Sequence, residues 1–234
     1  MKLKTKDRII FALDVPKLDR KTHVLLNKLE GKIRTIKVGL ELFSKYGKNI
    51  LQEFSGFDVF LDLKLDDIPT TIQRTVKNLI HPRIKFMTFQ GDNLTIRAAI
   101  KAYQDWNYSN WPVFLFVPIL SSRKFEFNPS FEHYYLKEMI DKVLREGNEL
   151  AKVGFIASGE RIKTIRQHDR ECVIISPGVR LSGGDKNEHK ESATPFDAIN
   201  NGADYIVVGR PIRDAKNPVA VIKQIKDNIE GKYQ

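Results

Sequence analysis

The 234-residue sequence is poor in cysteine and has no apolar run long enough to cross a membrane. Its single cysteine, Cys172, excludes an internal disulfide. Because Cys172 lies in an apolar run, we predict a buried thiol in a protein of the reducing cytoplasm. The basic N-terminus is followed only by the short run IIFALD, which is not the apolar core of a secretory signal. CxxC and HExxH patterns are absent, so we predict no metal site.

The sequence also lacks the patterns typical of nucleic-acid-binding proteins, although its formal net charge is +10. Lys and Arg are scattered along the chain, and we find neither zinc-finger spacing nor an RNP-like aromatic motif. A basic balance fits a nucleic acid, an acidic surface or an anionic substrate. We predict a solvated basic surface with a site for a small anion, and no binding to nucleic acid or membranes. A nucleotide- or nucleic-acid-binding barrel without catalytic activity is the alternative.

Short β-rich runs recur along the chain, and most are continuously apolar, which indicates strands covered on both faces of a parallel sheet. The predicted strands span residues 8–14, 34–39, 58–64, 84–90, 112–120, 152–158, 172–178 and 205–210. Segments with helical periodicity lie between them. The predicted helices span residues 18–32, 69–80, 93–106, 131–152, 158–169, 194–202 and 217–232.

This alternation predicts an α/β protein, a closed (β/α)8 TIM barrel that forms a single domain over residues 1–234. An open doubly wound sheet is the alternative fold. Such a sheet usually carries a GxGxxG turn after its first strand, whereas this chain has LDVPKLD there. The polar, glycine-rich segment 182–192 follows the seventh predicted strand and is a candidate lid.

Charged and polar residues stand where several predicted strands end, and in a barrel those ends form the active site. Asp14 ends the first strand, Lys37 lies in the second, and Ser121 follows the fifth. Taken singly, each has an ordinary interpretation as a cap, a turn residue or a solvated side chain. The set is more informative, because all of these residues converge on one end of one barrel.

The end of the eighth strand, in the string VVGRPI, predicts a phosphate site. In many barrels a phosphate binds beside the loops that follow the seventh and eighth strands. Gly209 would let the backbone approach closely, and Arg210 would supply a bidentate clamp. A phosphorylated substrate is therefore favoured.

The stretch DLKLDDIPTT, residues 62–71, places four charges at the end of a buried strand, where charge is costly. Period-two alternation puts Asp62 and Lys64 on the same face, within reach of Lys37 on the neighbouring strand. Asp67 lies just beyond, on the loop. Opposite charges side by side allow each group to stay ionised in a partly dry site. A catalytic charge network and a structural salt-bridge network at the barrel mouth are both consistent with this pattern.

This stretch resembles the DxKxxDIPxT motif of orotidine 5'-phosphate decarboxylases. The strings FALD, IKVGLELF, SPGVR and ADYIVVGRPI stand in the order of that family, so the resemblance covers nearly the whole chain. It implies a homodimeric (β/α)8 barrel with an active site shared across the interface. It also implies conversion of orotidine 5'-phosphate to UMP and CO2, the last step of de novo UMP synthesis. The resemblance further implies that this reaction uses no metal or cofactor and takes place in the cytoplasm.

The resemblance also implies roles for individual residues. Lys64 would donate a proton to C6 of the pyrimidine, Asp62 would face the substrate carboxylate, and Lys37 would bond the ribose. Asp67 would be supplied across the dimer interface. The remaining implied contacts are Asp14 at a ribose hydroxyl, Ile68 and Thr71 beside Asp67, Ser121 at the pyrimidine amide, Pro177 and Arg180 on the seventh-strand loop, and Gly209 and Arg210 at the phosphate.

The sequence departs from the family pattern at Asp66, Thr70 and Gln90, and its lid contact to the phosphate falls near Ser182 or His189. These changes leave the charged set intact. The alternative enzyme is a metal-dependent sugar-phosphate decarboxylase or aldolase on the same barrel. That group shares the DxK part of the motif but usually lacks the DIP continuation.

Overall fold

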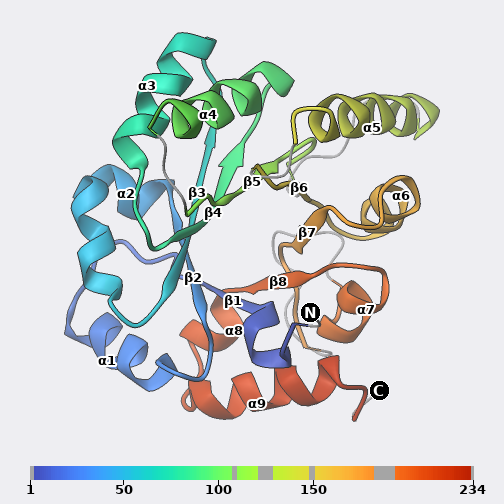
Figure 1. Ribbon diagram of the computed structural model, residues 1–234. Helices are drawn as coiled ribbons and strands as arrows, with labels where there is room; N and C mark the ends of the chain where they lie inside the picture. The colour runs from blue at the N-terminus through green and yellow to red at the C-terminus, as the bar shows by residue number, and fades with distance from the viewer. Residues whose placement is uncertain (1–2, 107–109, 121–128, 148–150, 182–192, 233–234) are drawn as a thin grey trace.

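The computed structural model describes residues 3–106, 110–120, 129–147, 151–181 and 193–232. Within this part of the chain, eight parallel strands pair in chain order and close into one barrel (Figure 1). The strands are β1 Ile9–Ala12, β2 Thr35–Gly39, β3 Asp58–Leu65, β4 Ile84–Phe89, β5 Val113–Phe116, β6 Val153–Ile156, β7 Val173–Ser176 and β8 Tyr205–Val208. The predicted single-domain barrel is confirmed. All the predicted strands are present, and all but β3, which extends one residue further to Leu65, are shorter than predicted.

Helices surround the barrel and cover the outer face of its strands (Figure 1). They are η1 Thr5–Arg8, α1 Arg20–Leu29, α2 Leu40–Tyr46, η2 Gly47–Phe54, α3 Pro69–Leu79, α4 Asn93–Trp106, α5 Pro129–Leu144, α6 Glu160–His168, α7 Pro195–Asn200, α8 Arg210–Arg213 and α9 Pro218–Ile229. Several begin at the signals that the sequence carries. Asp19 caps α1 by accepting a hydrogen bond from the Thr22 N–H, and Pro69 occupies the first turn of α3.

Two features of the helical layer differ from the sequence-based prediction. The predicted helix over residues 131–152 is too long, because α5 ends at Leu144 and is followed by a turn with Gly147 just beyond it. The sequence analysis also missed α2, η2 and the short α8. β2 ends at Gly39 directly before α2, η2 follows α2 at once, and only Gly209 separates β8 from α8, so no loop sequence marks where these elements begin.

The barrel has two apolar layers. Outward-facing strand residues pack against the helices, while inward-facing residues form a second cluster inside the barrel. Phe60 and Phe86 meet edge to face in this inner cluster, with ring centroids 5.9 Å apart. The inner cluster consists of Ile10, Ala12, Phe60, Phe86, Val113, Leu115, Ile175 and Val207. These side chains fill the barrel interior, so the space for a ligand lies at the carboxyl ends of the strands.

The single cysteine is buried, as predicted, with 7% of its surface exposed. Burial raises the pKa of the Cys172 thiol to about 12, so the thiol stays protonated and unreactive at neutral pH. A cytoplasmic location stays a prediction. In the described residues, no helix combines the length and apolar character needed to span a membrane.

Candidate active site

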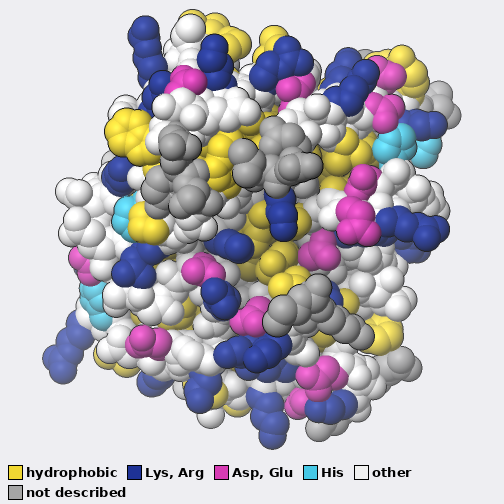
Figure 2. Space-filling view, in the orientation of Figure 1, with side chains coloured by type: hydrophobic (Ala, Val, Ile, Leu, Met, Phe, Trp, Pro, Cys, Tyr) yellow, Lys and Arg dark blue, Asp and Glu magenta, His cyan; other side chains and the backbone are white. Residues whose placement is uncertain are grey.

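A cavity of about 450 Å3 opens at the carboxyl ends of the strands, a size typical of small-molecule sites. Figure 2 shows this face of the molecule, where basic and acidic side chains gather around a hollow with hydrophobic side chains in its floor. The cavity is lined from β1, β2 and β3, from the segments that follow β5 and β7, and from α8. It therefore occupies the position at which (β/α)8 barrels carry their active sites.

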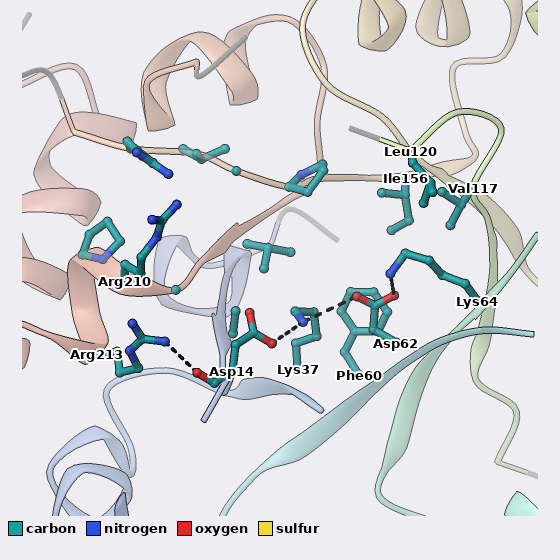
Figure 3. A pocket seen from close by; sticks show the side chains of 18 residues that line it. Asp14, Lys37, Phe60, Asp62, Lys64, Val117, Leu120, Ile156, Arg210 and Arg213 are labelled. Carbon is teal, nitrogen blue, oxygen red and sulfur yellow. Dashed lines mark hydrogen bonds and ion pairs between the residues drawn. The ribbon is translucent and has the colours of Figure 1, made fainter. Parts of the chain in front are cut away.

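Four side chains of alternating charge run along one wall of the cavity, and we call them the charge network: Asp14, Lys37, Asp62 and Lys64 (Figure 3). Lys37 Nζ lies 2.8 Å from Asp14 Oδ1 and 3.5 Å from Asp62 Oδ2. Lys64 Nζ lies 2.7 Å from Asp62 Oδ1. Asp62 thus lies between two lysines, and the predicted meeting of these strand-end charges is present in the structure.

The centre of the charge network is nearly dry. The side chains of Lys37 and Asp62 are only 12% and 13% exposed, whereas that of Lys64 is 34% exposed toward the cavity. Burial alone would raise the pKa of Asp62, but the charges of Lys37 and Lys64 outweigh it and hold that pKa below its usual value. Burial likewise opposes charge on Lys37, yet Asp62 and Asp14 raise its pKa above the usual value. Both groups are therefore ionised at neutral pH.

The end of the cavity beyond Asp14, away from Lys64, is cationic. Arg210 and Arg213 lie there together with Gly209, which immediately precedes α8 (Figure 3), and Arg180 also lines the cavity. Arg213 also braces this end, because its guanidinium donates to the backbone carbonyl of Asp14 at 2.6 Å and to both carboxylate oxygens of Asp214. The sequence analysis missed Arg213, although it stands three residues after Arg210 in the string GRPIRD.

Apolar side chains border the cavity near Lys64 (Figure 3). They are Phe60, Val117, Leu120 and Ile156. This wall lowers the local polarity around the lysine ammonium group, which strengthens its interaction with nearby charge. The sequence analysis missed these residues, because an apolar residue at a strand end reads the same whether it packs in the core or faces a ligand.

Most of the predicted site residues line this cavity, namely Asp14, Lys37, Asp62, Lys64, Pro177, Arg180, Gly209 and Arg210. Three others lie outside it and are exposed on the same chain, namely Asp67, Ile68 and Thr71. Asp67 accepts a hydrogen bond from the Ile68 N–H at 2.7 Å at the start of α3. Ser121, Ser182, His189 and the candidate lid 182–192 lie outside the described residues.

Two of the departures from the family pattern are neighbours in the structure. Asp66 lies against Gly91, the residue after Gln90, so closely that a Cβ atom at Gly91 would collide with its carboxylate. Gly91 also has a φ of +84°, which favours glycine. Thr70 is exposed in the first turn of α3. None of these residues lines the cavity. Across the described ranges, we find no group of three or more His, Cys, Asp or Glu side chains that could hold a metal ion.

A closed parallel barrel with ion-paired lysines and carboxylates at its mouth, and arginines lining the same cavity, defines an enzyme of the (β/α)8 class. The sequence model of the orotidine 5'-phosphate decarboxylase / HUMPS family matches residues 7–225 of this chain. The chain belongs to this family. The predictions of the family and of a carboxy-lyase are confirmed.

Individual relatives agree with the family assignment. The chain is 33% identical to the orotidine 5'-phosphate decarboxylase of Dictyoglomus thermophilum, over 96% of each chain. It is also 33% identical to that of Fusobacterium nucleatum, over 96% of this chain and 97% of the relative. The crystal structure of orotidine 5'-phosphate decarboxylase from Lactobacillus acidophilus superposes with a TM-score of 0.76 at 26% identity, covering 94% of this chain and 98% of that one.

Proposed function

We propose that this chain converts orotidine 5'-phosphate to UMP and CO2, the last step of de novo UMP synthesis, without a metal or cofactor. The family and the names of the relatives support the reaction. One observation supports this cavity as the place of the reaction. The charge network holds a lysine ammonium group, Lys64, at the cavity surface with a buried carboxylate, Asp62, directly behind it.

The decarboxylation requires a positive charge and a proton donor beside C6, and Lys64 supplies both in the proposed complex. When the bond between C6 and the carboxylate breaks, CO2 leaves and the electron pair stays on C6. The Lys64 ammonium group stabilises that charge and then gives C6 a proton, after which the neutral amine regains a proton from water. Asp62 accepts a hydrogen bond from the Lys64 ammonium group and, in the proposed complex, opposes the substrate carboxylate more than the charge developing on C6.

The protein supplies this electric field before the substrate arrives. Lys37 pairs with both Asp14 and Asp62, so the two carboxylates are fixed by one buried cation. Fixed charges need little reorganisation during the reaction, and they act more strongly in a dry site than in water. In the proposed complex, Asp14 and Lys37 also bond the ribose hydroxyls, which places the pyrimidine over Lys64.

The cationic end of the cavity is the proposed phosphate site. Arg210 and Arg180 supply positive charge there. Gly209 has no Cβ atom, so a phosphate oxygen can approach its backbone closely. Pro177 shapes the adjoining loop. The phosphate lies far from the reacting carbon, so its binding energy can hold the rest of the substrate against the charge network.

We further propose a homodimer in which Asp67, Ile68 and Thr71 act in the cavity of the partner subunit. Their exposure on their own chain supports this arrangement. Ile68 is 64% exposed, and Leu40 at the start of α2, which follows the neighbouring strand β2, is 63% exposed. Exposed large apolar side chains at the rim of a site are typical of a surface that another protein covers. The proposed partners include neither nucleic acid nor a membrane. The proposed location is the cytoplasm.

The direct test is the loss of orotidine 5'-phosphate, followed by its absorbance, with and without EDTA. We expect turnover that EDTA leaves unchanged within experimental error, because the proposed mechanism uses only side chains. Formation of UMP and CO2 in equal amounts would support the reaction. Turnover abolished by EDTA and restored by a divalent metal would instead favour a metal-dependent sugar-phosphate decarboxylase or aldolase on this barrel.

The phosphate site is tested by Arg210→Ala. We expect kcat/KM for orotidine 5'-phosphate to fall by about 10- to 100-fold, since a charge-assisted contact is worth about 1.5–3 kcal/mol. Turnover of orotidine, which lacks the phosphate, should change by less than about 2-fold at high enzyme concentration, because orotidine makes no phosphate contact with Arg210. Arg34→Ala is the matched control. Arg34 is exposed, lies just before β2 and pairs with Asp58. Equal losses on both substrates would contradict a phosphate role.

A further inference from the structure

Strand β3 is irregular at the position where it carries the charge network. Leu61 pairs with Met87 of β4, and Leu65 pairs with Phe89. Residues 62–64 of β3 therefore lie opposite a single residue of β4, Thr88. Such a bulge leaves backbone groups without their regular partners in the ladder and redirects the side chains. The sequence analysis treated this stretch as a regular strand and did not anticipate the bulge.

Lys64 has an unusual backbone conformation within this bulge. Its φ is +51°, and among the described residues it is the one non-glycine residue with a positive φ. This region is unfavourable for a residue with a Cβ atom and persists only where the surroundings hold it. The same residue presents its ammonium group to the cavity, so the strained backbone fixes where that group lies.

A buried hydroxyl holds this conformation. The Lys64 N–H donates to Thr88 Oγ1 at 2.9 Å, which replaces the ladder bond that the bulge removes. The Thr88 hydroxyl donates in turn to Asp62 Oδ1 at 3.0 Å, the oxygen that also accepts from Lys64 Nζ. The hydroxyl has a single proton, so its two bonds have a fixed direction. The ring of contacts runs from the Lys64 backbone through Thr88 and Asp62 to the Lys64 side chain.

We propose that Thr88 is a positioning residue, which sets the placement of Lys64 and Asp62 for the reaction through its single buried hydroxyl. Thr88 is fully buried and does not line the cavity, so it acts through these two residues rather than on the substrate. The inference rests on the proposed function. Catalytic groups must be held to within about 0.5 Å of their working geometry, which requires supporting contacts of this kind.

The test compares Thr88→Val, which removes the hydroxyl at similar size, with Thr88→Ser, which keeps it. We expect Thr88→Val to lower kcat by about 10- to 100-fold while KM changes by less than about 3-fold, and Thr88→Ser to retain at least about a third of wild-type kcat. The acid limb of the kcat profile should move to higher pH in Thr88→Val. The hydroxyl stabilises the ionised Asp62 carboxylate, so its loss raises the pKa of that group.

Two controls separate positioning from stability and from the reaction itself. Thr22→Val removes another buried threonine hydroxyl bonded to a carboxylate, that of Asp19, and should leave kcat and its pH profile unchanged. If Thr88→Val folds poorly, Thr88→Ala removes the hydroxyl without placing a methyl group against Asp62. Amide hydrogen exchange at Lys64 should be faster in Thr88→Val and in Thr88→Ala than in the wild type. This measurement tests the contact without any substrate.

The outcomes are distinguishable. An inactive wild type with a protected Lys64 amide overturns the proposed function while leaving the structural contact intact. An active wild type with Thr88→Val equal to it in kcat and pH profile overturns the role of Thr88 alone. Equal losses in Thr88→Val and Thr88→Ser would also overturn it, because the serine hydroxyl preserves both hydrogen bonds.

Discussion

Replacing Lys64 with Ala should lower kcat by about 10^4-fold or more while the affinity for UMP changes by less than about 10-fold. Two contributions are lost together, the fixed positive charge beside C6 and the proton that C6 receives. A loss of 10^4-fold corresponds to about 5.4 kcal/mol of transition-state stabilisation. In the proposed complex, UMP binding depends mainly on the phosphate and ribose contacts at the other end of the cavity. Single-turnover kinetics and calorimetric titration with UMP measure the two quantities.

Two further variants show which property of Lys64 matters. Lys64→Arg keeps a positive charge but holds its proton too firmly to donate it, so we expect it to stay at least about 10^3-fold below wild type. Lys85→Ala, an exposed lysine near the amino end of β4, is the matched control and should retain full activity. Substantial turnover in Lys64→Ala would contradict the assignment of Lys64 as the proton donor.

The sequence predicted those parts of the site in which the residue type itself carries the chemistry. Charged residues at the ends of apolar strands are costly unless they are paired, so Asp62, Lys64 and Lys37 could be recognised as a set. The strands were recognisable because most of them are apolar on both faces. The structure brings these residues together through the pairing of β3 with β2, although β3 bulges at residues 62–64 instead of alternating regularly.

The remaining features depend on geometry that no local pattern records. Thr88 is an ordinary β-former in the run IKFMTF, and only the bulge in β3 turns its hydroxyl into a support for Lys64. Leu120 and Ile156 border the cavity because of where their strands end, not because of their type. Asp67 is the reverse case. The motif marks it clearly, but on its own chain it is exposed and lies outside the cavity.

Asp67→Ala should lower kcat by about 10^3-fold, although Asp67 does not reach the cavity of its own chain. Among the described residues, the Lys64 ammonium group has one carboxylate partner, Asp62, and stays 34% exposed. We expect Asp67 of the partner subunit to supply the next negative charge in the alternating series. Its removal would then leave Lys64 with a less constrained position. Steady-state kinetics of the purified variant measure the loss.

Mixing two inactive variants tests the shared site without any structure of the dimer. In a heterodimer of Lys64→Ala and Asp67→Ala chains, one site lacks both residues and the other has both. Random exchange at equal amounts should therefore restore about a quarter of wild-type activity. Mixing wild type with the double variant is the matched control. It should leave about a quarter of the sites active rather than half, because each heterodimer then contains two defective sites. No recovery in the first mixture, with subunit exchange verified by native mass spectrometry, would mean that each chain builds its site alone.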